Sequence, residues 1–343
     1  MILVLKKNSA ETSRLPIEGF LNANHISYRY VGKLHALVIP KYQQTAIFEQ
    51  FDGIDTIIPI NTPYQLASKS YKNQTSFHVN DVSVGEGLFN VMAGPCSVEN
   101  EEQIFATAEF LSSLGVKFLR GGAYKPRTSP YSFRGLETEG LKLLHKAAKA
   151  YNMNVVTELL DGSLLDEVAT YADIIQVGSR NMHNFHLLDQ LGKINKPILL
   201  KRGFQAKAVE WLLAAEYIMS GGNEQIILCE RGIRSFDPSS RNVIDLGVVP
   251  IIKELSHLPI IVDPSHGTGA ASRVTPASLA AAAIGADGVL IEVHPDPSRA
   301  LSDSEQAIAF DEFSILLNKT KMLLNALGKQ TDTETTVLNS GRL

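Results

Sequence analysis

The sequence predicts an α/β protein, a (β/α)8 TIM barrel preceded by a small ferredoxin-like (βαββαβ) domain. Eight short apolar runs alternate with stretches of helical character, and each run is followed by a charged or metal-coordinating residue. The first 70 residues do not share this pattern. A parallel strand that is buried on both faces has a continuous apolar sequence. Eight strand–helix units close into a barrel whose active site lies at the carboxyl ends of the strands.

The eight predicted strands lie within residues 88–330, a length close to the usual barrel size of about 250 residues. The runs are Leu88–Ala93, Val116–Leu119, Val155–Thr157, Ile174–Val177, Pro197–Leu200, Gln225–Leu228, Pro259–Val262 and Gly288–Ile291. The residues that follow them are, in order, Cys96, Arg120, Glu158, Arg180, Lys201 with Arg202, Glu230 with Arg231, Asp263 with His266, and Glu292 with His294. These side chains are therefore expected at one rim of the barrel.

Residues 1–70 form the predicted ferredoxin-like domain, whose strand and helix order is that of a split βαβ unit. Its elements are a strand Ile2–Leu5, a helix Leu15–Asn24 with Pro16 in its first turn, strands Ile26–Val31 and Leu34–Ile39 around a Gly32-Lys33 turn, a helix Tyr42–Phe51 and a strand Ile54–Ile60. Residues 71–87 are a linker and a hairpin, Phe77–Val84, that is expected to close the amino-terminal end of the barrel. Residues 331–343 are a polar tail that we expect to fray.

Composition narrows the compartment and the partners. The net charge of −4 offers no general attraction for nucleic acid or an anionic membrane. No apolar run approaches the roughly 20 residues that a membrane span needs. The two cysteines, Cys96 and Cys229, lie far apart and do not resemble a disulfide framework, so a cytoplasmic protein is expected.

Four residues near the first, seventh and eighth strands form a candidate metal site: Cys96, His266, Glu292 and Asp303. These strands are neighbours when a barrel closes, so the side chains can converge. Thiolate, imidazole and carboxylate ligands together suit one divalent ion, Mn, Fe, Co or Zn. The alternatives are that Cys96 is a small buried hydrophobic residue, as expected for Cys229, and that His294 supplies the imidazole in place of His266.

Cations dominate the rest of the predicted rim: Arg120, Lys125, Arg127, Arg180, Lys201, Arg202 and Arg231. Glu158 and Glu230 offset only part of this charge, which predicts substrates with several negative charges. Lys125, Arg127, Thr128 and Ser129 lie within five residues and form a plausible phosphate cradle. The alternative is an ordinary solvated surface, which we favour only for Arg134 and Arg273.

Five motifs in this order resemble 3-deoxy-D-arabino-heptulosonate 7-phosphate (DAHP) synthase, most closely the subfamily with a ferredoxin-like N-terminal domain. They are Gly94-Pro95-Cys96-Ser97, Lys125-Pro126-Arg127-Thr128-Ser129, Leu200-Lys201-Arg202-Gly203, Cys229-Glu230-Arg231-Gly232 and Asp263-Pro264-Ser265-His266. The resemblance implies a transferase that condenses phosphoenolpyruvate and erythrose 4-phosphate with water to give DAHP and phosphate, the first step of the shikimate pathway.

The resemblance also implies roles for individual residues. Cys96, His266, Glu292 and Asp303 would hold the metal; Arg120, Lys125, Arg180, Lys201 and Arg231 would bind phosphoenolpyruvate; Arg127, Thr128 and Ser129 would bind erythrose 4-phosphate. Cys96, Lys125 and His266 would be catalytic, with Lys125 or a water on the metal carrying the proton. Tyrosine or phenylalanine would act as an effector through the N-terminal domain, and the chain would form a homotetramer.

Two other functions compete with this interpretation. The first is 3-deoxy-D-manno-octulosonate 8-phosphate synthase, which joins phosphoenolpyruvate to a different phosphosugar. That family tends to carry Ala-Asn-Arg-Ser after its lysine, whereas this chain has Pro126-Arg127-Thr128. The second is a non-catalytic sensor on a barrel, which the intact ligand and cation sets disfavour.

Overall fold

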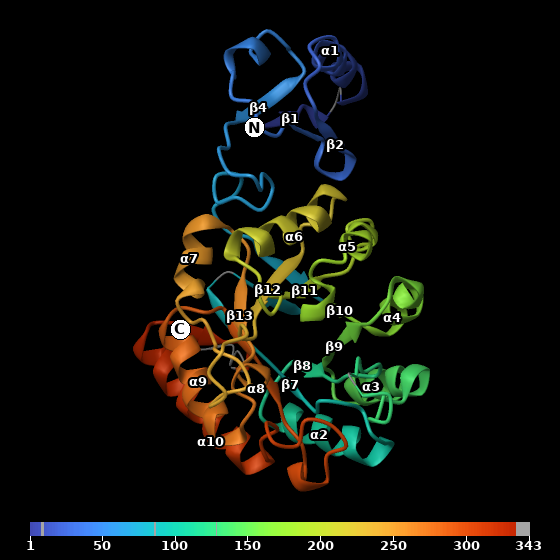
Figure 1. Cartoon of the computed structure of the whole chain (residues 1–343), viewed down its shortest axis with the longest axis vertical. Coiled ribbons are helices and arrows are strands. Elements are labelled where there is room, and N and C mark those ends of the chain that lie inside the picture. The colour runs from blue at the N-terminus through green and yellow to red at the C-terminus, as the bar shows by residue number, and fades with distance from the viewer. Residues whose placement is uncertain (8–9, 86, 128, 334–343) are drawn as a thin grey trace, which may run out of the picture.

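The computed structural model describes residues 1–7, 10–85, 87–127 and 129–333. It consists of a small antiparallel sheet at the N-terminus and a large barrel, joined by the segment after β4 (Ile54–Ile58) (Figure 1). Helix α6 (Ala208–Ser220) lies on the side of the barrel that faces the small sheet. Among the described helices, none has the length and apolar character needed to cross a membrane.

Eight parallel strands form the predicted barrel. They are β7 (Leu88–Gly94), β8 (Phe118–Arg120), β9 (Asn154–Leu159), β10 (Ile174–Val177), β11 (Ile198–Lys201), β12 (Ile226–Glu230), β13 (Ile260–Val262) and β14 (Gly288–Glu292). They pair in sequence order, and β14 pairs with β7 from Gly288↔Asn90 to Glu292↔Gly94 to close the barrel. The predicted barrel fold is therefore confirmed.

Helices surround the barrel and cover the outward side chains of its strands. They are α2 (Glu101–Ser113), α3 (Glu137–Ala150), α4 (Leu165–Tyr171), α5 (Phe185–Leu191), α6, α7 (Val248–Leu255), α9 (Ala271–Ala283) and α10 (Phe310–Ala326), with a short extra helix α8 (Pro264–Thr268) after β13. Trp211 of α6 is fully buried and donates a hydrogen bond to the Leu200 carbonyl, which ties that helix to β11.

The inner face of the barrel explains where the polar residues lie. One layer of inward side chains is apolar: Met92, Phe118, Val156, Ile174, Leu199, Ile227, Cys229, Ile261 and Leu290. The hairpin β5 (Phe77–Val79) and β6 (Val82–Val84) packs its valines against this layer. Side chains of a strand return to the same face every second residue. The residue two positions further along the same strand therefore also points inward. At six strands this residue is polar or charged: Arg120, Glu158, Lys201, Arg231, Asp263 and Glu292.

The N-terminal sheet has the strand order β2-β3-β1-β4, formed by β1 (Ile2–Leu5), β2 (Arg29–Val31), β3 (Ala36–Val38) and β4. Neighbouring strands are antiparallel. The turn between β2 and β3 is longer than the two residues predicted, because Gly32–Leu34 forms a 3₁₀ turn and His35 is left-handed.

Both helices predicted in this unit need correction. Helix α1 (Ala10–Ala23) begins five residues before Leu15, so Pro16 lies inside the helix. The predicted helix Tyr42–Phe51 is wrong: only a 3₁₀ turn, Ala46–Phe48, forms there. Phe48 is fully buried and packs edge-to-face with Phe20, and one short turn is enough to place it. The unit therefore lacks the second helix of the predicted βαββαβ pattern.

The C-terminal tail starts later than predicted. Strand β15 (Gln330–Thr331) pairs in parallel with the start of β7. Asp332 is buried beside it and accepts hydrogen bonds from Asn90 Nδ2 and the Val91 amide, each at 3.2 Å. Burial raises the pKa of Asp332 to about 7. The prediction of a frayed tail is thus wrong for residues 331–333, while residues 334–343 lie outside the described part of the chain.

Candidate active site

Three of the four predicted metal ligands meet at the carboxyl ends of β7 and β14. The Cys96 sulfur and carboxylate oxygens of Glu292 and Asp303 all lie within 4.8 Å of one another. The Cys96 thiol donates to Asp303 Oδ2 at 3.3 Å. His266 completes the set, with its Nε2 at 3.3 Å from Glu292 Oε1 and 3.9 Å from Asp303 Oδ2. His294 instead lies 3.4 Å from Glu99, so it does not take the place of His266.

The elements that carry these residues fix their positions. Glu292 is the last residue of β14 and pairs in register with Gly94, two residues before Cys96. His266 lies on α8, whose N-cap Asp263 accepts from the His266 amide at 3.0 Å. Asp303 lies in the loop after β14 with a φ of 49°, a left-handed conformation that aspartate tolerates better than most residues.

Asp263 links the imidazole to the cations. Its Oδ2 lies 2.7 Å from His266 Nδ1 and accepts from Lys201 Nζ at 2.6 Å. Such a carboxylate fixes which nitrogen of a histidine faces a metal, as it does in many metal sites. Because Nδ1 faces Asp263, the other nitrogen, Nε2, faces Glu292 and Asp303.

The protonation states suit a cation site. Burial, followed by the charge of Glu292, raises the pKa of Cys96 to about 12, so the thiol is protonated in the absence of a cation. Burial lowers the pKa of His266, which keeps the imidazole neutral. Burial opposes ionisation of Asp303, but His266 when protonated, Arg241 and Lys125 lower its pKa to about 2. A neutral imidazole and two carboxylates can bind a metal directly, whereas the thiol must first lose its proton.

A cavity of about 320 Å³ opens beside this cluster. Its lining includes five cations and two carboxylates: Lys125, Arg127, Arg180, Arg231, Arg241, Glu158 and Asp303. Ser129 and His266 also line it, so the structure brings most of the predicted site residues together. Two guanidinium nitrogens, Arg120 Nε and Arg127 Nη2, are buried with no hydrogen-bond partner among the described residues. Buried donors are normally satisfied, so these nitrogens favour an anionic ligand.

Lys125 connects the cavity to the cluster, and Arg120, which does not line the cavity, contacts the cluster from within the barrel. Lys125 Nζ donates to the Cys96 carbonyl at 2.9 Å and lies 3.1 Å from the Cys96 sulfur. Arg120 Nη1 pairs with Glu292 Oε1 at 3.1 Å. Glu158 reaches into the site past Gly178, where an added Cβ would lie 2.0 Å from Glu158 Oε1. Gly178 therefore has to be a glycine for Glu158 to keep this position.

Three residues of the site were not predicted from the sequence. Phe204 follows the Lys201-Arg202-Gly203 motif, and its ring lies under the guanidinium groups of Arg180 at 5.6 Å and Arg231 at 4.7 Å. Arg241 and Gln306 come from loops and contact the acidic ligands. An aromatic residue within three positions of a cationic strand end was a usable signal for Phe204, since arginines stack on aromatic faces. Arg241 and Gln306 gave no comparable signal.

Some predicted residues lie elsewhere or cannot be placed. Arg202 does not line the cavity; it pairs with Glu230 and Asp245, each at 2.9 Å. Thr128, predicted to bind erythrose 4-phosphate, lies outside the described residues. Cys229 is fully buried in the inner apolar layer, as expected for a structural cysteine.

Comparisons of the sequence and of the structure with known proteins both match DAHP synthases. Residues 62–326 match the DAHP synthetase I family. The chain is 48% identical over 334 residues to the phospho-2-dehydro-3-deoxyheptonate aldolase of Thermotoga maritima, covering 96% of this chain and 99% of that protein. The crystal structure of the Thermotoga maritima enzyme, also named DAHP synthase, superimposes with a TM-score of 0.78 at 47% identity, covering 96% of this chain and 98% of the other. The 2-dehydro-3-deoxyphosphooctonate aldolase of Francisella tularensis is more distant, at 32% identity, covering 73% of this chain and 97% of that protein.

The high pKa of Cys96 predicts a pH-dependent metal affinity. If a divalent cation binds the thiolate, each binding event displaces one proton, because the free thiol is protonated up to about pH 12. The affinity for Mn²⁺ should therefore rise about tenfold for each unit of pH between about pH 7 and 8. Equilibrium dialysis or electron paramagnetic resonance titration would measure it.

Cys96→Ser should weaken Mn²⁺ binding and flatten this slope, whereas Cys229→Ala should retain both. Cys229 is the matched control because it is an equally buried thiol in the barrel interior. An affinity of the wild-type chain that does not change with pH would contradict a thiolate ligand.

Proposed function

The chain belongs to the DAHP synthetase I family and has the DAHP synthase activity of that family, and from this premise we propose how its residues carry out the reaction. The observation that carries the proposal is the meeting of Cys96, His266, Glu292 and Asp303 beside a cavity rich in cations. The family reaction condenses phosphoenolpyruvate and erythrose 4-phosphate with water, and both substrates are anionic.

The bonds that form and break in this condensation determine what the site has to provide. The methylene carbon of phosphoenolpyruvate forms a bond to the aldehyde carbon, whose oxygen takes up a proton. The neighbouring carbon becomes cationic and is attacked by water, which loses a proton. The resulting hemiketal breaks its bond to the phosphate oxygen, giving the ketone of DAHP and inorganic phosphate. The site must therefore hold two anions in contact, supply one proton to the aldehyde oxygen, admit one water and accept the proton that this water loses.

Cys96, His266, Glu292 and Asp303 fit a single divalent ion, because they offer one sulfur, one neutral imidazole and two carboxylates from separate segments. Such an ion would supply Lewis-acid polarisation of the aldehyde oxygen. We propose Mn, Fe, Co or Zn, which this donor set accepts. Lys125, whose Nζ lies 3.1 Å from the Cys96 sulfur, is the proposed donor of the proton to the aldehyde oxygen.

Phosphoenolpyruvate is proposed to bind Arg120, Lys125, Arg180, Lys201 and Arg231. Arg180 and Arg231 are held over the same Phe204 ring, which presents both guanidinium groups to the cavity. Lys201 is fixed by Asp263 at 2.6 Å. Prepositioned cations of this kind offset the repulsion between two anionic substrates and reduce the entropy lost in bringing them together.

The phosphate of erythrose 4-phosphate is proposed to bind Arg127 and Thr128, with Ser129 close by. Arg127 is anchored by donation from its Nε to the Phe133 carbonyl at 2.9 Å, while its Nη2 has no partner among the described residues. The free nitrogen of an anchored guanidinium is well suited to a phosphate oxygen.

The activity predicts a choice of aldehyde. With phosphoenolpyruvate, the chain should release phosphate rapidly with erythrose 4-phosphate and slowly with arabinose 5-phosphate, the substrate expected for the octulosonate alternative. EDTA should lower the rate and Mn²⁺ should restore it. A higher kcat/KM with arabinose 5-phosphate would contradict the assignment.

Arg180 offers a clean test of the phosphoenolpyruvate site, because it lines the cavity and is exposed. Arg180→Met should raise KM for phosphoenolpyruvate by roughly 10- to 100-fold, the equivalent of about 1.5–3 kcal/mol for a hydrogen bond to a charged group. The matched control is Arg234→Met, since Arg234 also lies over Phe204, at 5.0 Å, but outside the lining of the cavity. Equal KM values in the two variants would contradict the role of Arg180.

We also propose that the N-terminal unit binds tyrosine or phenylalanine and that the chain forms a homotetramer. The unit packs on the barrel through apolar residues, among them Ile2 and Val38, that share one buried cluster with residues of α6. Polar contacts add to this packing: Glu216 of α6 accepts from the Leu66 and Ala67 amides at 3.0 and 2.9 Å. Lys33 Nζ donates to the Lys193 carbonyl at 3.2 Å.

An effector in the N-terminal unit should inhibit the full chain but not a chain that starts near Lys72. Initial rates of phosphate release with each aromatic amino acid would measure this, and light scattering of the same samples would report the oligomeric state. Equal insensitivity of the two chains would remove the regulatory role.

A further inference from the structure

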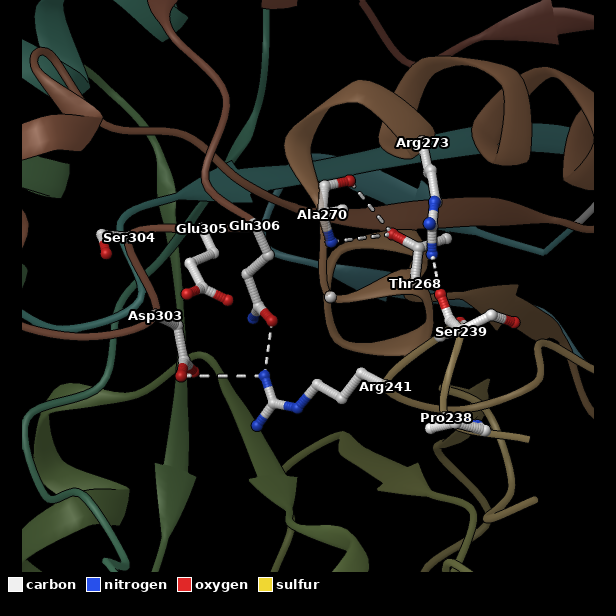
Figure 2. A pocket seen from close by; sticks show the side chains of 12 residues that line it. Pro238, Ser239, Arg241, Thr268, Ala270, Arg273, Asp303, Ser304, Glu305 and Gln306 are labelled. Carbon is white, nitrogen blue, oxygen red and sulfur yellow. Dashed lines mark hydrogen bonds and ion pairs between the residues drawn. The ribbon is translucent and has the colours of Figure 1, made fainter. Parts of the chain in front are cut away.

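Arg241 and Gln306 connect the two acidic members of the candidate metal site. Gln306 Nε2 donates to Glu292 Oε2 at 2.5 Å, and Gln306 Oε1 accepts from Arg241 Nη1, also at 2.5 Å. The same Arg241 Nη1 lies 3.7 Å from Asp303 Oδ1 (Figure 2). One guanidinium group from the loop after β12 therefore reaches Asp303 directly and Glu292 through an amide.

The network fixes the orientation of each group. An amide has one acceptor oxygen and one donor nitrogen, so an arginine at Oε1 turns Nε2 of Gln306 towards Glu292. The other oxygen of Glu292, Oε1, is already contacted by Arg120 at 3.1 Å and His266 at 3.3 Å. Both oxygens of this buried carboxylate are thus held, and its plane is set before any cation binds.

The position of Arg241 needs a physical reason. A positive charge near two carboxylates opposes the binding of a cation by those carboxylates. Arg241 lies between the cavity of about 320 Å³ and a second cavity of about 600 Å³, and lines both. Figure 2 shows it extending from its own loop to Asp303 and Gln306. The contacts of Arg241 instead fix the relative positions of Glu292, at the end of β14, and Asp303, in the loop that follows.

We propose that Arg241 and Gln306 are positioning residues that orient Glu292 and Asp303 and thereby strengthen the binding of the divalent cation. The inference rests on the proposed metal site. Residues that orient metal ligands typically contribute about 10- to 100-fold to metal affinity. Gln306 is buried and neutral, so its contribution is one of geometry alone.

Gln306→Met and Arg241→Lys test the proposal without changing net charge. Methionine fills the space of glutamine but cannot donate to Glu292, and lysine keeps the charge of Arg241 but cannot reproduce its planar contact. Each variant should weaken Mn²⁺ binding about tenfold, measured by equilibrium dialysis of the full chain. The double variant should lose little more than either single variant, because the two residues act in one chain of contacts. With saturating Mn²⁺, Gln306→Met should keep its KM for phosphoenolpyruvate within about twofold of wild type, because Gln306 does not line the cavity of about 320 Å³.

Arg273→Lys is the matched control, because Arg273 lines the larger cavity but donates only to the Ser239 carbonyl among the contacts described. It should bind Mn²⁺ as the wild type does.

Glu292→Gln, measured in parallel, distinguishes a failure of the proposed metal site from a failure of the positioning role. If Glu292→Gln keeps wild-type Mn²⁺ affinity, the metal site itself is wrong. If Glu292→Gln loses affinity while Gln306→Met and Arg241→Lys keep it, or if the two losses add fully, the positioning role is wrong. Circular dichroism would establish that Arg241→Lys, at a side chain 42% exposed, retains the fold.

Discussion

Closure of the barrel between β7 and β14 is the constraint on which the site depends. Glu292 pairs with Gly94 across this seam, although the two residues are almost 200 positions apart in sequence. The chain continues from Gly94 to Cys96, and from Glu292 to Asp303, on the same side of the seam. At Gly94 an added Cβ would lie 2.0 Å from the Arg120 carbonyl oxygen, so the close approach of the parallel strands β7 and β8 at this point requires glycine. The seam therefore brings the thiol and the two carboxylates together without a local sequence motif.

The buried charges of the site form one network rather than separate metal and substrate sites. Asp263 is shared by Lys201 and His266, and Glu292 is shared by Arg120, His266 and Gln306. Removing one partner of a buried pair leaves the other charge uncompensated, at a cost of about 3–5 kcal/mol. For this reason Lys201→Ala would not report on phosphoenolpyruvate alone, since it would also strip Asp263 of the cation that faces it. Exposed Arg180 carries no such complication.

The sequence predicted those parts of the molecule that follow from strand periodicity. All eight barrel strands were found as apolar runs, and the inward side chains at their ends follow from the period of two. Residues contributed by loops could not be found in this way: Arg241 and Gln306 lie on segments without periodicity, and their partners are distant in sequence. The prediction of a helix at Tyr42–Phe51 was wrong. A few apolar residues in a short stretch have helical spacing, but a single 3₁₀ turn also brings them into one apolar cluster. At the C-terminus, the polar composition of residues 330–333 gave no sign that a strand would pair there with β7.

Lys125 joins the candidate metal ligands to the cavity, and Gly122 leaves room for its side chain. The ammonium group of Lys125 contacts both the carbonyl and the sulfur of Cys96, and the same side chain lines the cavity. A Cβ at Gly122 would lie 2.6 Å from Lys125 Cδ and 2.8 Å from the Cys96 carbonyl oxygen, so any larger residue would displace the lysine or the strand end. The positive charge of Lys125 favours the thiolate form of Cys96, which is the form that binds metal. The same ammonium group therefore favours the thiolate and lines the cavity, so a single side chain connects the candidate metal ligands with the cavity.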